Sequence, residues 1–266
     1  MTTLPTYFIS HGGGPWPFMK TEYGQTYAKL EATLQDMPRQ LGVTPKAILV
    51  ISAHWEEAEF TVQANATPGM IYDYSGFPEH TYHISYPAPG SPELAKQVQA
   101  LIEQAGFAAK LDLQRGFDHG TYSALFPIYP NADIPIVQLS LKAHLDPASH
   151  IALGRALAPL RQQGILIIGS GLSYHNLRQF GPSGYAASRE FDDWLQDTLI
   201  QSDSIRRVEK LLAWSQAPSA RAAHPREEHL LPLMVALGAA QEDVASCVYH
   251  ENTFMGGLTV SSFRFG

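Results

Sequence analysis

The sequence contains a single cysteine, Cys247, among 266 residues. One cysteine cannot form an intramolecular disulfide, and a cysteine-rich metal site is excluded for the same reason. A chain of this length buries a full hydrophobic core without covalent cross-links. The sequence also lacks the basic segment followed by an apolar segment that is typical of a secretory signal. We therefore expect a cytoplasmic protein.

Positive charge and long apolar runs are scarce as well. Lys and Arg number 18 against 25 Asp and Glu, which gives a formal net charge of −7. A mildly acidic chain without a basic cluster is poorly matched to the phosphates of a nucleic acid, so we expect no nucleic-acid partner. No apolar run approaches the roughly 18 residues that a membrane-spanning helix needs, so we expect no membrane span.

Short hydrophobic strands alternate with amphipathic helices, a pattern that favours the α/β class. Strands are expected over residues 7–10, 47–52, 60–64, 108–113, 134–141, 164–171, 245–249 and 258–265. Helices are expected over residues 24–41, 92–106, 147–164, 186–199, 205–214 and 224–238. No repeat or linker divides the chain. We predict one domain over residues 1–266, with a central mixed sheet flanked by helices and a metal site at the carboxyl edge of its strands.

Histidine is unusually frequent, and it is both the commonest metal ligand and the readiest acid or base near neutral pH. His11 and His54 each follow a buried strand, where open α/β sheets place their ligand sites. Together they predict a metal at that edge, and His119, His175 and His229 are candidates for the remaining roles. The eleven histidines are at positions 11, 54, 80, 83, 119, 144, 150, 175, 224, 229 and 250.

The remaining histidines are weaker candidates. His80 and His83 lie in residues 67–92, an irregular aromatic segment that we interpret as a lid or pocket wall, so substrate contact and solvation are both open for them. His224 and His229 are five residues apart and would point in different directions from one helix, so they are not expected to be paired ligands. Surface or capping roles are assigned to His144, His150 and His250.

One motif points elsewhere and is not supported. Residues 11–14, His-Gly-Gly-Gly, match the oxyanion loop of some α/β-hydrolases, but the G-x-S-x-G nucleophile elbow of that class is missing. The phosphate-binding patterns G-x-x-x-x-G-K-[ST] and G-x-G-x-x-G and the zinc motif H-E-x-x-H are missing too. A serine hydrolase and a nucleotide-dependent enzyme are therefore excluded.

Seven short blocks, in order along nearly the whole chain, resemble the DOPA-dioxygenase type of class III extradiol aromatic ring-opening dioxygenases. This group is related to the catalytic subunit of protocatechuate 4,5-dioxygenase. Each block is weak alone, and the set is highly specific. The blocks are SAHW (52–55), GFP (76–78), YPAPGSP (86–92), GFDHG (116–120), DIPIVQLS (133–140), HNLR (175–178) and EHLLPL (228–233).

The resemblance implies a non-haem Fe(II) held by His11, His54 and His229. The protocatechuate branch has a glutamate as its third ligand, which gives the usual set of two histidines and one carboxylate. Here a histidine stands at that place, and Glu228 beside it is either a partner of this ligand or the ligand itself. Three neutral histidines also make a good zinc site, so zinc is expected to enter recombinant protein.

The resemblance also implies a reaction in which the ring of a small aromatic diol opens with O2. Proton transfers accompany that reaction, and they suit a histidine near its free pKa of ~6.5. His175 matches the acid/base residue of the family, and His119 matches the residue that hydrogen-bonds the substrate hydroxyl or the bound oxygen. Both are therefore implied to contact the substrate. A monomer and a homo-oligomer are equally compatible with the sequence.

Two other functions stay open at this point. A zinc-dependent hydrolase would use the same three histidines without a catechol pocket, and Fe(II)-dependent oxygen uptake separates it from a dioxygenase. A non-enzymatic binding protein on this scaffold is the other alternative. His119 and His175 speak against it, because holding a metal does not require them. The sequence does not identify the catechol.

Overall fold

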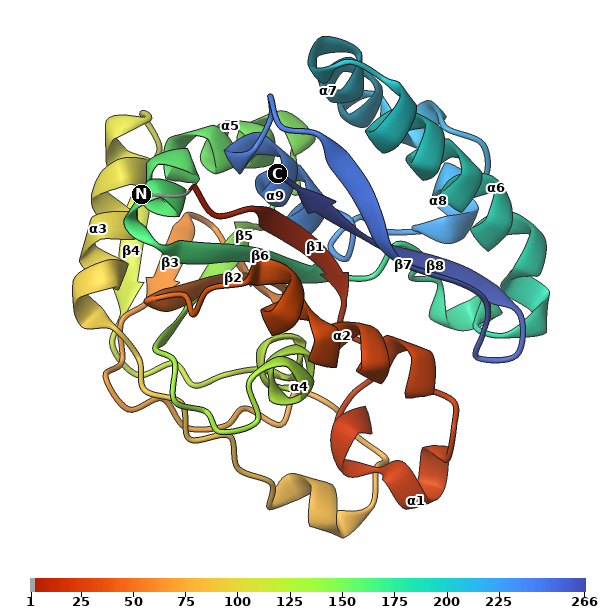
Figure 1. The fold of residues 1–266 in the computed structure, drawn as a ribbon, viewed down its shortest axis with the longest axis horizontal. Helices are drawn as coiled ribbons and strands as arrows, with labels where there is room; N and C mark the ends of the chain where they lie inside the picture. Colours follow the sequence, from red (N-terminus) through yellow and green to blue (C-terminus); the bar gives the residue numbers. More distant parts are fainter. Residues whose placement is uncertain (1–2) are drawn as a thin grey trace.

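Eight strands form one mixed sheet at the centre of the molecule (Figure 1). The structure, a computed structural model, describes residues 3–266. The strand order is β4-β3-β5-β2-β6-β1-β8-β7, which confirms the predicted α/β class with a central mixed sheet. The strands are β1 (Thr6–Ser10), β2 (Ala47–Glu57), β3 (Phe60–Gln63), β4 (Ala109–Asp112), β5 (Ile136–Lys142), β6 (Ile165–Gly171), β7 (Ala245–Phe254) and β8 (Leu258–Phe265).

The four central strands, β5, β2, β6 and β1, are parallel. They are nearly continuous apolar runs because both of their faces are covered by helices. Parallel neighbours end at the same edge, and the register places Ser10 opposite Gly171 and Ser52 opposite Ser170. The residues that follow Ser10 of β1, Ser52 of β2 and Gly171 of β6 therefore meet at one place, which is where ligands bind in open α/β sheets.

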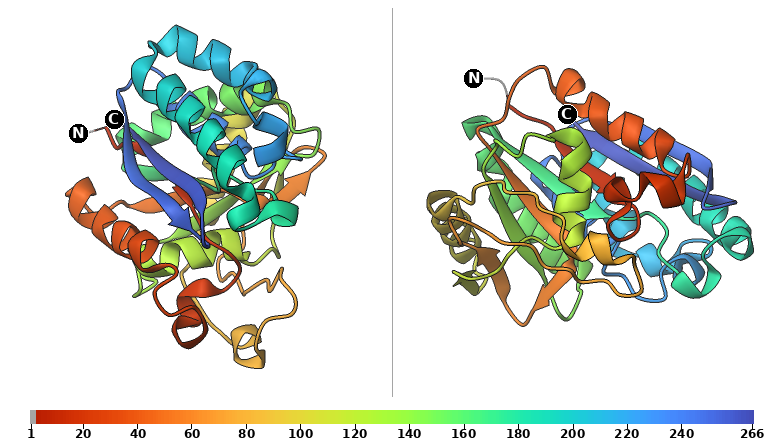
Figure 2. Two further views of the ribbon diagram at one scale, coloured as in Figure 1. Left: turned by 90° about the vertical axis from the view of Figure 1, so that its right-hand side faces the viewer. Right: turned by 90° about the horizontal axis from the view of Figure 1, so that it is seen from below.

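Helices cover both faces of this sheet (Figures 1 and 2). One layer contains α2 and α4, and the opposite layer contains α3, α5, α9 and α6. The helices are α1 (Lys20–Tyr23), α2 (Ala28–Leu41), α3 (Pro92–Gln104), α4 (His119–Ile128), α5 (Pro147–Leu157), α6 (Tyr185–Gln196), α7 (Ser204–Leu212), α8 (Ala220–Ala223) and α9 (Leu231–Ala239).

Helix α4 is not among the helices predicted from the sequence. Its residues are buried on nearly all sides of the helix and include Pro127, so the sequence shows no amphipathic period. The helix begins where Asp118 accepts a hydrogen bond from the backbone N–H of Thr121, at 3.2 Å. Asp118 also accepts from the hydroxyl of Ser52 at 2.7 Å, which ties the start of α4 to β2.

Two predicted helices begin later than expected. The helix predicted over residues 24–41 begins at Ala28, because Gly24 ends α1 with a φ of 52°. The helix predicted over residues 224–238 begins at Leu231, and the residues before it form a turn. Strand β2, in contrast, runs past its predicted end at residue 52 to Glu57.

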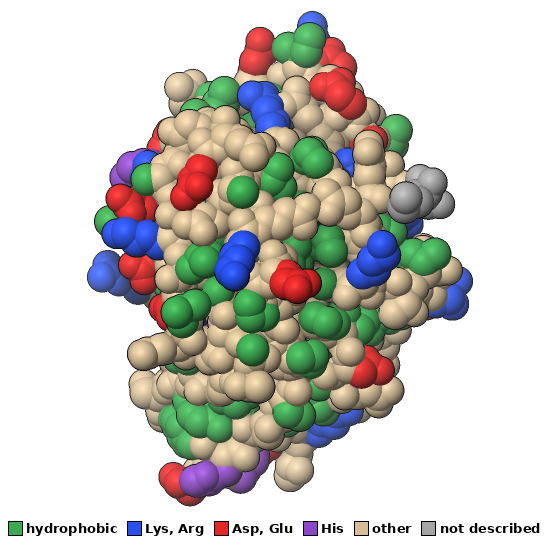
Figure 3. Space-filling model, turned by 90° about the vertical axis from the view of Figure 1, so that its left-hand side faces the viewer, with side chains coloured by type: hydrophobic (Ala, Val, Ile, Leu, Met, Phe, Trp, Pro, Cys, Tyr) green, Lys and Arg blue, Asp and Glu red, His purple; other side chains and the backbone are tan. Residues whose placement is uncertain are grey.

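Charged side chains of both signs are interspersed on the face shown in Figure 3, where Lys and Arg lie among Asp and Glu. This mixing agrees with the modest excess of acidic residues in the sequence. Within residues 3–266, no helix combines the length and the apolar character that crossing a membrane requires.

The surface or capping role expected of His150 is corrected by its burial, because its side chain is fully enclosed at the start of α5. Its Nδ1–H donates to the carbonyl of Asp146 at 2.7 Å, and its Nε2 accepts from the backbone N–H of Lys142 at 3.2 Å. Both ring nitrogens are thus used, and the ring is held neutral: burial lowers the pKa of His150 to about 4.

This histidine makes the stability of the fold sensitive to acid. Below pH ~6.5 the unfolded chain binds a proton at His150 that the folded chain does not, so stability present above pH ~6.5 is lost as the pH falls toward 4. The unfolding free energy of the native chain should fall between pH 7.5 and pH 4.5. In His150→Gln we expect this fall to be smaller by about 2–3 kcal/mol, because the titrating group is gone. Urea denaturation of the metal-free protein measures this, with exposed His144→Gln as the control. Equal pH dependence in His150→Gln and the native chain would contradict it.

Candidate functional site

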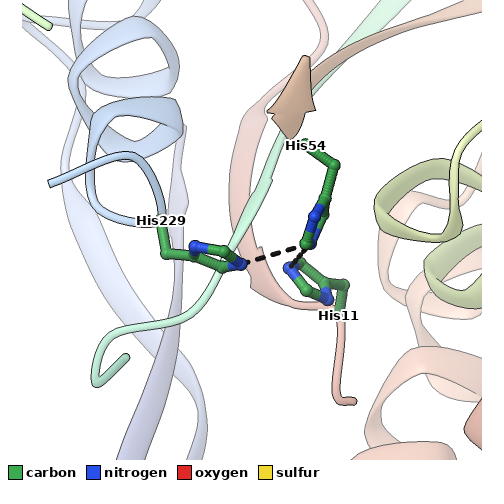
Figure 4. Close-up of side chains that lie close together, drawn as sticks. All are labelled: His11, His54 and His229. Atoms are coloured by element: carbon green, nitrogen blue, oxygen red, sulfur yellow. Dashed lines mark hydrogen bonds between the residues drawn. The ribbon is translucent and has the colours of Figure 1, made fainter. Parts of the chain in front are cut away.

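Three imidazoles point toward one another at the carboxyl edge of the sheet (Figure 4). His11 follows β1, His54 lies in the extension of β2, and His229 lies in the turn before α9. The Nε2 atom of His54 lies 3.3 Å from Nε2 of His11 and 3.2 Å from Nε2 of His229. The structure thus brings together the three residues that the sequence resemblance singled out as ligands.

The chemistry of these three nitrogens fits a bound cation. The Nδ1–H of His229 donates to the carboxylate of Glu228 at 2.9 Å, so the lone pair of this ring is on Nε2 and faces His54. Burial first, and neighbouring histidines second, lower the pKa of His11, His54 and His229 well below the usual value. Neutral nitrogens whose lone pairs converge repel one another, and a divalent cation bound between them removes that repulsion.

Asp73 supports one side of this cluster. Its Oδ1 accepts from the backbone N–H of His119 at 3.0 Å and from Nδ1–H of His119 at 2.9 Å, while its Oδ2 lies 3.5 Å from Nδ1 of His54. Burial is the largest single influence and raises the pKa of Asp73, but the hydrogen bonds from His119 and the electrostatic attraction of His119 and His54 together outweigh it, so the net shift is downward. Asp73 is therefore ionised and orients both rings. Asp73 lies in the aromatic segment over residues 67–92, and no sequence motif distinguishes it there.

Glu228 supports the other side in the same manner. Its Oε1 accepts from Nδ1–H of His175 at 3.0 Å and from Nδ1–H of His229 at 2.9 Å. The two rings stack with their centroids 3.4 Å apart. Burial is the largest single influence and raises the pKa of Glu228, but the hydrogen bond from His175, a backbone hydrogen bond and the electrostatic attraction of His175 and Arg226 together outweigh it, so the net shift is downward. In this geometry Glu228 is a partner of His229, which was one of the two roles expected for it.

A cavity of about 690 Å³ opens over these histidines. Its aromatic walls are formed by Tyr23, Tyr27, Tyr74, Phe77 and Phe180. Asp73, Tyr74 and Phe77 of the aromatic segment therefore form part of the pocket wall, as expected. All five histidines predicted for the site contribute to the lining, namely His11, His54, His119, His175 and His229.

The other histidines lie apart from this cavity. His80 and His83 are exposed, and His83 contacts Glu79 at 3.0 Å instead of facing the cavity. His224 is fully buried and its Nε2 contacts the carbonyl of Ser173 at 2.9 Å, so it is not paired with His229 as a ligand.

The position of His229 relative to the sheet depends on a close contact between the backbone of β6 and the backbone around the start of α9. The N–H of Leu172, just after β6, donates to the carbonyl of His229 at 3.1 Å. A Cβ atom at Gly171 would lie 2.1 Å from that carbonyl oxygen, and a Cβ atom at Gly169 would lie 2.2 Å from the carbonyl oxygen of Pro232. Only glycine leaves room for the turn at these two positions.

We therefore expect Gly171→Ala to displace the turn that carries His229. Metal affinity should fall by about tenfold or more, as it does when a residue that orients a histidine ligand is removed. Metal retained after dialysis, together with circular dichroism to confirm folding, measures this. Gly69→Ala is the matched control, because a Cβ there meets no atom within 4 Å. Full metal retention in folded Gly171→Ala would refute this role of the glycine.

The chain is similar to a solved structure and to curated proteins over nearly its whole length. A crystal structure of an uncharacterized protein from Escherichia coli K12 superimposes with a TM-score of 0.77, at 32% identity, and covers 99% of this chain and 100% of that one. The 4,5-DOPA dioxygenase extradiol of Beta vulgaris is 40% identical over 264 residues, which are 98% of this chain and 96% of the relative. The protein of the same name from Escherichia coli K12 is 35% identical, over 100% of this chain and 96% of the relative.

One family description covers almost the whole chain. Residues 5–266 match the catalytic LigB subunit of aromatic ring-opening dioxygenase. The similarity extends across every element that supplies a histidine to the cavity, from β1 to the turn before α9. The chain therefore belongs to the LigB family of aromatic ring-opening dioxygenases.

Proposed function

We propose that this protein is an Fe(II)-dependent extradiol dioxygenase that opens the ring of a DOPA-like or related catechol with O2. The observation that carries the proposal is the convergence of three neutral imidazole nitrogens on the floor of an aromatic cavity, with two more histidines beside them. The names of the relatives support the substrate, because several are called 4,5-DOPA dioxygenase extradiol. We assign the activity to one domain over residues 1–266.

His11, His54 and His229 are the proposed ligands. When bound there, Fe(II) supplies the redox chemistry that O2 needs and the positive charge that favours an ionised catechol. Zinc would fit the same nitrogens but has no redox chemistry. The proposal therefore separates metal binding, which several divalent cations share, from ring opening, which requires iron.

The proton transfers are assigned to His175. Because its Nδ1–H is held by Glu228, the lone pair of the neutral ring is on Nε2, which is the atom able to accept a proton from a substrate hydroxyl and return it later. His119 is held by Asp73 in the same way. We assign it the hydrogen bond to the substrate hydroxyl or to oxygen. Tyr74 and Phe77 of the wall exclude water from the ring.

The activity itself is tested by oxygen consumption. The metal-free protein is reloaded with Fe(II) without air and then given O2 with catechols that include DOPA. We expect oxygen uptake together with a new yellow product, and no uptake when zinc replaces iron. If iron is verified in place and no catechol is consumed, the dioxygenase proposal fails and a zinc hydrolase or a binding protein takes its place.

Ligand and acid/base roles are separated by two variants. His11→Ala should lose the metal, because only two of the three proposed ligand nitrogens would remain, which is too few to hold it. His175→Ala should keep the metal and lose about 10²–10⁴-fold in turnover, the usual contribution of acid/base catalysis. Metal analysis and kcat on the same preparations measure both effects.

The matched control for both variants is His83→Ala, an exposed histidine outside the cavity lining, for which no change is expected. Full metal occupancy in His11→Ala would refute the ligand role, and undiminished turnover in His175→Ala would refute the acid/base role.

A further inference from the structure

The cavity wall contains an ion pair between Arg226 and Glu56, and neither side chain is hydrogen-bonded to a histidine of the site. Both terminal nitrogens of Arg226 donate to the carboxylate of Glu56, on β2. The side chain of Arg226 is 53% exposed and that of Glu56 is 24% exposed, so the pair lies at the rim of the cavity. Among the described residues, 3–266, Arg226 is the only Lys or Arg in the lining of the main cavity.

Arg226 keeps hydrogen-bonding capacity beyond this pair. A guanidinium carries five N–H donors, and the two bonds to Glu56 use two of them. Its Nη1 lies 3.6 Å from Oε2 of Glu228, which is too far for a hydrogen bond. The remaining donors of this anchored, planar group suit a carboxylate, which arginine binds with better geometry than lysine does.

A second cavity, of about 450 Å³, adjoins the same wall. It shares His175, Leu177, Arg226 and Glu228 with the main cavity. Arg178 also lines it, and in the described part of the chain no carboxylate lies within 4 Å of the Arg178 guanidinium. A group that leaves the main cavity past Leu177 therefore meets two guanidinium groups, one of them without an ionic partner.

We propose that Arg226, assisted by Arg178, binds a carboxylate on the side chain of the substrate. This inference rests on the proposed function and deepens it by naming the substrate class, a catechol with a short acidic side chain. Arg226 lies next to Glu228, and Glu228 is hydrogen-bonded to the proposed ligand His229. Only the side chain of Glu228 therefore separates the guanidinium from the histidines over which the catechol ring would bind. The ring lies over the histidines, and its acidic tail reaches the wall between the two cavities.

The test compares two catechols on the Fe(II)-loaded enzyme, 3-(3,4-dihydroxyphenyl)propionate and uncharged 4-methylcatechol. We expect Arg226→Gln to lower the ratio of their kcat/KM values by roughly tenfold to hundredfold, the range for losing a hydrogen bond between charged groups. Arg178→Gln should lower the same ratio by a smaller factor. A merely structural role for Arg226 would reduce both kcat/KM values together and leave the ratio unchanged, which would overturn the inference.

The matched control is Arg221→Gln. The Arg221 side chain is 52% exposed and pairs with Glu227 at 2.6 Å, but it lines neither cavity, so the kcat/KM ratio should stay at the native value. A fall equal to that of Arg226→Gln would show a general effect of surface charge and would overturn the proposal.

A binding measurement on the native protein keeps the two proposals distinguishable. By calorimetry without O2, the Fe(II)-loaded protein should bind 3-phenylpropionate more tightly than 2-phenylethylamine, which carries a positive charge instead. Equal binding, or tighter binding of the amine, overturns the carboxylate site whether or not any catechol is turned over. Preferred binding of the acid without any catechol turnover would retain the carboxylate site and reject the dioxygenase.

Discussion

Hydrogen bonds from histidine rings to two partly buried carboxylates fix the geometry of the candidate site. Asp73 orients His119 and lies beside His54, and Glu228 orients His175 and His229. Each carboxylate thus supports one proposed metal ligand and one proposed substrate-contacting histidine. A shift of either carboxylate would move a proposed ligand and a neighbouring histidine together, so the proposed roles in metal binding and proton transfer depend on the same two side chains.

Strand β6 is the element that most directly joins stability to the site. It lies between β1 and β2, whose ends supply His11 and His54, and its fully buried residues form part of the core. Its two glycines also admit the backbone of the turn that carries His229. The interior of the sheet therefore cannot be repacked freely, because added side-chain volume at Gly169 or Gly171 would displace the turn that carries His229.

The order of apolar and polar residues along the chain predicts only those features of the site that depend on residues close together in the sequence. The apolar runs of β1 and β2 predict His11 and His54 at the sheet edge, whereas the roles proposed for His119, His175 and His229 depend on the family resemblance. Asp73 escaped prediction because its partner His119 is 46 residues away. The Arg226–Glu56 pair, separated by 170 residues, escaped for the same reason. Contacts of this kind arise from strand order, which the sequence pattern does not encode locally.

Burial alone does not distinguish a structural histidine from a site histidine in this chain. His150 is as buried as His229, and burial lowers the pKa of both. The difference lies in the partners of the two nitrogens. Both nitrogens of His150 meet backbone groups, which completes its hydrogen bonding within the fold. Nε2 of His229 instead faces another imidazole nitrogen, an arrangement that is incomplete until a cation binds, and this unmet requirement marks the site.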